Sequence, residues 1–97
     1  MNFKLENDTL TIYLQGRLNS YNSEEVEKEI YSIIDGQTFT HLALDFKDLQ
    51  YISSAGIRII MALKQRFNDI VLKRVSSDIN DIFTMVGLQS IITIERQ

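Results

Sequence analysis

The fold of this chain is decided by the stretch Leu44-Asp45-Phe46-Lys47-Asp48-Leu49-Gln50-Tyr51-Ile52-Ser53-Ser54-Ala55-Gly56-Ile57. It continues an apolar alternation over residues 41–46, which predicts a buried strand. A short loop is expected next, and apolar residues at helical spacing over residues 53–67 predict a helix. The stretch therefore predicts a strand, a loop and a helix whose first turn carries a hydroxyl group.

The preceding segment predicts a hairpin and a helix. Period-two alternation at residues 3–5 and 9–14 predicts two strands with one face in the core, and Gly16 is expected to end the second. Asn22 or Ser23 then begins a helix, and Asn22 with Glu25 resembles a capping box. The apolar residues with helical spacing are Val26, Ile30, Ile33 and Ile34. Gly36 is expected to end this helix in the left-handed conformation.

The last third of the chain repeats the alternation of strand and helix. A short strand is predicted at residues 70–72, a helix from Ser76 to Gly87, and a last strand at residues 91–94. The order is therefore β-β-α-β-α-β-α-β. It predicts an α/β fold with a two-layer mixed sheet of about five strands and three main helices, in a single domain over residues 1–97.

The composition excludes several classes of protein. The chain has 97 residues, 44% of them apolar and 24% charged, with a net charge of −3. That charge argues against a nucleic-acid partner, which needs a clustered basic surface. The chain has no cysteine, which excludes disulfides and thiolate metal sites. No apolar run is long enough for direct membrane insertion, and we expect a cytoplasmic protein.

Three pieces of the sequence, taken together, resemble a STAS domain, the fold shared by anti-sigma-factor antagonists and the cytosolic part of sulfate transporters. They are Gly16-Arg17-Leu18-Asn19, the central stretch, and Ile82-Phe83-Thr84-Met85-Val86-Gly87-Leu88. The resemblance covers nearly the whole chain. It implies that this is a binding protein rather than an enzyme, with no cofactor.

The resemblance also implies a phosphorylation site. In the family the central loop usually reads Asp-Ser-Ser/Thr/Ala-Gly-Leu, and a cognate anti-sigma kinase phosphorylates the serine directly after the aspartate. By position that serine is Ser54. Ser53 stands where the aspartate usually is, Ala55 where a second hydroxyl is common, and Asn19 where a second aspartate is frequent.

The residues themselves support the same chemistry at Ser54. A helix begins with unsatisfied backbone N–H groups and the positive end of its dipole, so a phosphate group is tolerated there while a docking partner meets a bulky dianion. The alternative is that Ser53 or Ser54 is an ordinary N-cap. The two interpretations are compatible, since one serine can cap while the other is exposed.

We expect the partner to bind two loops at the same end of the sheet. The predicted partner-binding residues are Asn19, Ser20, Tyr21, Ser53, Ser54, Ala55, Gly56 and Arg58. The small size of Ala55 and Gly56 would let a partner backbone approach. Tyr51 and Met85 are further candidates for partial exposure near this surface.

Two functions remain open from the sequence. The first is an anti-sigma-factor antagonist that binds an anti-sigma factor serine kinase and is released when Ser54 is phosphorylated. The second is a non-phosphorylated regulatory or structural subunit of a larger assembly, such as a lipid-transport ATPase complex. An enzyme is disfavoured: Asp45 and Asp48 have no third metal ligand, His41 has no triad partner, and Asp48 is expected to cap a turn. The sequence leaves the oligomeric state open.

Overall fold

The computed structural model describes all residues from Met1 to Gln97 and contains one five-stranded sheet. Strand order follows the chain, from β1 at one edge to β5 at the other; β1 is antiparallel to β2, and all other neighbours are parallel. The elements are β1 (Asn2–Glu6), β2 (Thr9–Leu18), α1 (Ser23–Asp35), β3 (His41–Ile52), α2 (Ser54–Arg66), β4 (Ile70–Val75), α3 (Ser77–Met85), a 3₁₀ turn (Leu88–Ser90) and β5 (Thr93–Arg96).

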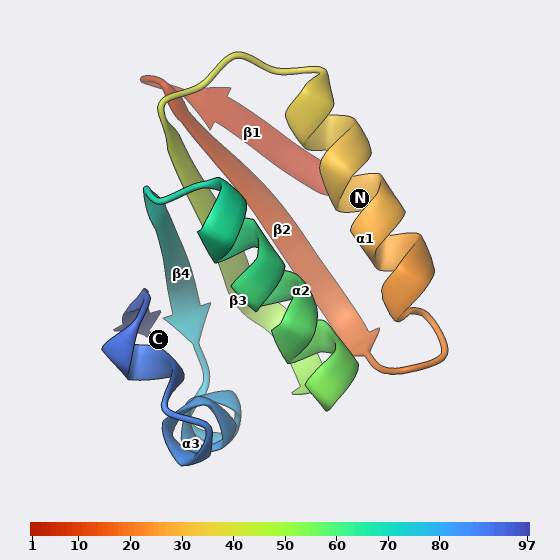
Figure 1. The fold of residues 1–97 in the computed structure, drawn as a ribbon, viewed down its shortest axis with the longest axis vertical. Coiled ribbons are helices and arrows are strands. Elements are labelled where there is room, and N and C mark those ends of the chain that lie inside the picture. Colours follow the sequence, from red (N-terminus) through yellow and green to blue (C-terminus); the bar gives the residue numbers. More distant parts are fainter.

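The helices pack against one side of the sheet, which gives two layers. Figure 1 shows α1 and α2 side by side along that face, with α3 beyond the end of β4. Twenty-two buried apolar residues form the core between the layers. Phe83 of α3 meets Phe46 of β3 edge-on, with ring centroids 5.8 Å apart. The predicted fold class and order of elements are confirmed.

The central strand β3 is longer than predicted. Residues 47–52 continue the strand instead of forming a loop, so Asp48 lies within β3 and caps no turn. The apolar residues Leu49 and Ile52 are both buried but are three positions apart. This half of the strand therefore does not show the period-two alternation by which a strand is predicted. The cause is irregular pairing, because the register between β2 and β3 shifts twice along this half.

Two glycine expectations were wrong. β2 continues past Gly16 to Leu18, since Gly16 adopts a φ of 74° beside a register shift and bends the strand without ending it. Gly36 follows α1 with a right-handed φ of −89°, and its N–H donates to the carbonyl of Ile33. Gly87 does adopt a positive φ of 75° after α3. A 3₁₀ turn follows it, and β5 therefore begins at Thr93, two residues later than predicted.

Asp45 is the one buried charged residue of the chain, 6% exposed. Its Oδ2 accepts a hydrogen bond of 2.8 Å from Arg74 Nε, and its Oδ1 accepts one of 3.0 Å from the N–H of Lys47. The hydrogen bond to Asp45 raises the pKa of the Arg74 guanidinium. Both oxygens of the carboxylate are therefore engaged within the protein.

Candidate functional site

The parallel strands place three loops at one end of the molecule. β2, β3 and β4 lead directly into α1, α2 and α3, so the helix N-termini gather at the lower end in Figure 1. Residues 19–22 and residues 53–58, which we call the candidate site, lie there. The expectation that these two loops share one end of the sheet is confirmed.

Ser53 is the N-cap of α2. Its backbone is extended, with φ −98° and ψ 176°, and its Oγ accepts a hydrogen bond of 3.4 Å from the N–H of Gly56. Its own N–H donates to the carbonyl of Leu18, 2.9 Å away. These contacts attach the start of α2 to the end of β2. The ordinary capping role therefore belongs to Ser53, where a family aspartate would serve equally well.

Ser54 is the first residue of α2, and it is exposed. Because Ser53 supplies the cap, Ser54 is not needed for that role. The first turn of α2 contains no acidic residue, so the positive end of its dipole is not offset within the helix. The geometry leaves a hydroxyl group accessible at the N-terminus of a 13-residue helix.

Gly56 is buried and faces the interior of the protein. A Cβ atom at this position would lie 2.7 Å from Ile52 Cγ1 and 2.8 Å from Leu18 Cγ. Glycine is thus needed so that α2 can pack closely on β2 and β3. The expectation that Gly56 helps a partner backbone to approach was wrong, because its missing side chain makes room inside the protein. Ala55 is half-buried at the surface.

The loop before α1 is held by a pair of asparagines. Asn19 Oδ1 accepts hydrogen bonds from the N–H groups of Tyr21 and Asn22, at 2.9 and 3.1 Å. Asn22 Oδ1 accepts from the N–H of Asn19 at 2.9 Å, and its Nδ2 donates to the carbonyl of Arg17 at 2.7 Å. The capping box with Glu25 was therefore wrong, since the side chain of Asn22 turns back into the loop. The fixed loop presents Tyr21, which is 97% exposed.

An open groove of about 700 Å³ runs between α1 and α2 beside Ser54. Four of the predicted partner-binding residues line it: Ser20, Tyr21, Ala55 and Arg58. The lining residues that sequence reasoning missed are Ser23, Glu24, Glu27, Ile59 and Ala62. On the α2 side, residues 55, 58, 59 and 62 are spaced so that they share one face of a helix, and this spacing could have predicted that Ile59 and Ala62 lie beside Ala55 and Arg58. Ala55, Ile59 and Ala62 supply an apolar floor.

The charged groups of this groove are unpaired. Glu24 and Glu27 lie on the α1 side and Arg58 on the α2 side, and none of them belongs to the five ion pairs of the structure.

Tyr51, 38% exposed, lies under the Arg17 guanidinium at 4.4 Å from the ring centroid. Met85, in the last turn of α3, is 85% exposed.

A model of one protein family, described as the STAS domain, matches residues 1–97. The chain belongs to the STAS domain family. The resemblance inferred from the three sequence pieces is thereby confirmed over the full length of the chain.

The relatives of this STAS domain are described as anti-sigma factor antagonists. The provisionally named anti-sigma factor antagonist BtrV of Bordetella bronchiseptica is 34% identical over 82 residues, which cover 80% of this chain and 70% of BtrV. The anti-sigma-B factor antagonist of Listeria monocytogenes is 26% identical over 96 residues, 93% of this chain and 82% of that protein.

Solved structures show the same fold. The unphosphorylated anti-sigma factor antagonist SpoIIAA superposes with a TM-score of 0.72 at 21% identity, covering 96% of this STAS domain and 87% of SpoIIAA. The phosphorylated form of Bacillus SpoIIAA superposes with a TM-score of 0.64.

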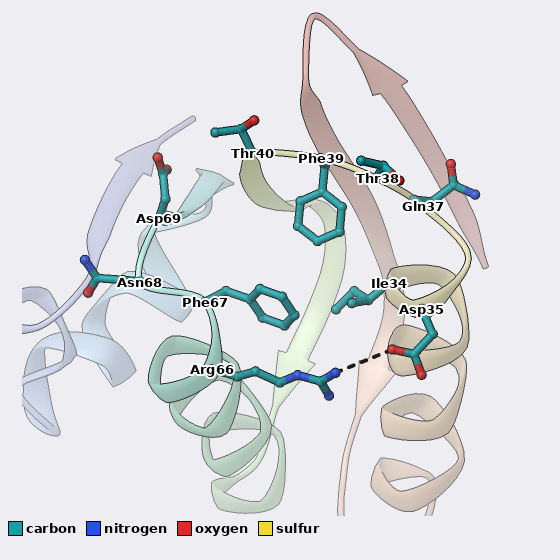
Figure 2. A pocket seen from close by; sticks show the side chains of 10 residues that line it. All are labelled: Ile34, Asp35, Gln37, Thr38, Phe39, Thr40, Arg66, Phe67, Asn68 and Asp69. Carbon is teal, nitrogen blue, oxygen red and sulfur yellow. Dashed lines mark ion pairs between the residues drawn. The ribbon is translucent and has the colours of Figure 1, made fainter.

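A second hollow of this STAS domain lies at the opposite end of α2. Figure 2 shows Phe39, Phe67 and Ile34 pointing into it, with Asp35 and Arg66 paired at one side. Next to it, His41 Nδ1 lies 2.6 Å from Asp69 Oδ2, both exposed. The histidine thus has a carboxylate partner but no nucleophile among its polar contacts.

The domain contains no group of three or more His, Cys, Asp or Glu side chains placed to hold a metal ion. None of its helices combines the length and the apolar character needed to cross a membrane.

Proposed function

We propose that this STAS domain is an anti-sigma-factor antagonist of the cytoplasm, a phosphorylation-controlled binding switch that sequesters an anti-sigma factor with serine kinase activity. The observation that carries the proposal is the exposed hydroxyl of Ser54, which starts α2 while Ser53 does the capping. The names of its relatives as anti-sigma factor antagonists support the class of partner.

Phosphorylation at this position leaves the fold intact. The kinase transfers the γ-phosphoryl group of ATP to Ser54 Oγ, so that an O–P bond forms, the bond to ADP breaks and the hydroxyl proton passes to a base of the kinase. The product carries about −1.5 to −2 charges. The free N–H groups of the first helical turn and the dipole accommodate that charge.

The same charge disrupts a closed interface. Ser54 lies next to the groove formed by Tyr21, Ala55 and Arg58, which offers an exposed aromatic ring, an apolar floor and charges of both signs. A protein that covers this groove removes water from Ser54 as well. A partner surface that encloses the dianion and offers it no cation of its own then costs several kcal/mol in desolvation, which corresponds to a loss of affinity of about 100-fold or more.

The test uses the intact chain with candidate serine kinases and ATP, and mass spectrometry to locate the phosphate. We expect phosphate on Ser54, none after Ser54→Ala, and normal phosphorylation of Ser77→Ala. Ser77 is a matched control because it is the exposed first residue of α3, directly after the N-cap Ser76, and lies outside the groove. Ser54→Asp should weaken kinase binding while Ser54→Ala preserves it.

Two results would reject the proposal: phosphate on Ser53 alone or nowhere, or equal binding by Ser54→Asp and wild type. If the main partner is a transporter ATPase and Ser54→Ala does not change its binding, the result would instead support the role of an assembly subunit.

A further inference from the structure

We propose that Arg58 is a built-in clamp for the phosphate of Ser54, and that phosphorylation withdraws this arginine from the partner-binding groove. The inference rests on the proposed function for the presence of a phosphate at Ser54. It adds a residue and a second mode of action to the switch.

The first argument is the geometry of α2. Ser54 and Arg58 are four residues apart in one helix, so their side chains are neighbours on the same face. Side chains of a helix tilt toward its N-terminus, which directs the long side chain of Arg58 back over the first turn. A guanidinium group in that place reaches the phosphate oxygens with two parallel donors.

The second argument is the availability of Arg58. It is exposed, and it takes part in none of the five ion pairs. The other arginines are engaged: Arg66 with Asp35, Arg74 with Asp45, Arg96 with Ser77, and Arg17 with the ring of Tyr51. Arg58 therefore breaks no existing contact when it binds a new anion.

The third argument is the charge of the groove. Without phosphate, Arg58 lines the groove opposite Glu24 and Glu27 and is open to an acidic group of the partner. A phosphate one turn away in the same helix carries about −1.5 to −2 charges, more than either single carboxylate of the groove, and it therefore competes with them for Arg58. Phosphorylation thus adds negative charge at Ser54 and removes the positive charge that the partner would meet.

The experiment installs phosphoserine at position 54 during translation, so it needs no kinase and its outcome is independent of the proposed partner. Phosphorus NMR then follows the second ionisation of the phosphate. A nearby cation favours the dianion, so the pKa should be lower in wild type than in Arg58→Gln, by roughly 0.4 unit for an exposed pair at this spacing. Glu24 and Glu27 face Arg58 in both proteins, so the difference isolates the arginine.

Two variants provide the controls. Arg58→Lys keeps a cation and should restore most of the shift, whereas Arg66→Gln should change nothing, because twelve residues of helix place it about 18 Å from Ser54, beyond the screening length. In wild type the Nε–H resonance of Arg58 should also move when the phosphate is present. An equal phosphate pKa in wild type and Arg58→Gln, with an unmoved Arg58 resonance, would overturn the clamp even if Ser54 proves to be the site that the kinase uses.

Discussion

Replacing Gly56 with alanine should destabilise the protein, although alanine is the better helix former. The new Cβ would lie 2.7 Å from Ile52 Cγ1 and 2.8 Å from Leu18 Cγ, whereas carbon atoms in contact are about 3.5–4.0 Å apart. Leu18 and Ile52 are only 3% and 2% exposed, so neither can move outward. Either α2 or the strands must shift by roughly 1 Å to relieve the overlap.

The magnitude follows from two opposing terms. Overpacking of a close-packed core costs about 1–3 kcal/mol, and alanine gains at most about 1 kcal/mol over glycine within a helix. Because Gly56 lies in the first turn, the gain is at the lower end. We expect a net loss of about 1–2 kcal/mol in the free energy of unfolding, or a Tm lower by roughly 5–15 °C in a chain of this size.

Urea unfolding followed by far-UV circular dichroism measures the effect. Gln65→Ala, at an exposed position of the same helix, is the matched control and should change the stability by less than about 0.5 kcal/mol. Leu18→Ala should also cost less in the Gly56→Ala background than in wild type, because it removes one of the clashing side chains. A Gly56→Ala variant as stable as wild type would refute the packing argument.

Substitutions at two further positions test how the candidate site is anchored. Ser53→Ala should lower the free energy of unfolding by about 1 kcal/mol, because the N-cap is lost. Ser53→Asp should stay within about 0.5 kcal/mol of wild type, since a carboxylate also caps a helix. Equal melting temperatures of wild type and both variants would show that the 3.4 Å contact from Gly56 contributes nothing to stability. Asn22→Ala removes hydrogen bonds to Asn19 and Arg17 and should cost about 1–3 kcal/mol, with faster amide exchange over residues 19–22; unchanged exchange there would contradict the role given to this side chain.

Sequence patterns predicted the strands and helices whose apolar periodicity follows directly from the burial of one face of the element. The alternation at residues 41–46 and the helical spacing after Ser53 identified β3 and α2, because burial on one face imposes each period directly. The order of elements then fixed the topology, since parallel neighbours require crossovers through helices. For the same reason the order of elements alone was enough to place the two loops of the candidate site at one end of the sheet.

The errors arose where a contact with a neighbouring element or loop overrode a rule based on one element alone. Asn22 has the side chain of a helix cap, but the carbonyl of Arg17, on the bent end of β2, is a partner that no local pattern reveals. Gly56 was interpreted as a surface residue, since only the packing of α2 against Leu18 and Ile52 shows which way it faces. Both corrections concern contacts between the helices and the strand ends.

The parallel course of α1 and α2 has a consequence for how partners approach. Both helices direct their N-termini to the end that carries Ser54 and their C-termini to the end that carries Asp35 and Asp69. Glu24 and Glu25 offset the dipole of α1, but nothing in the first turn of α2 offsets its own. An acidic group that approaches along the axis of α2 therefore meets a positive helix end at Ser54, although Glu24 and Glu27 of α1 line the neighbouring groove. Added salt should weaken that local attraction.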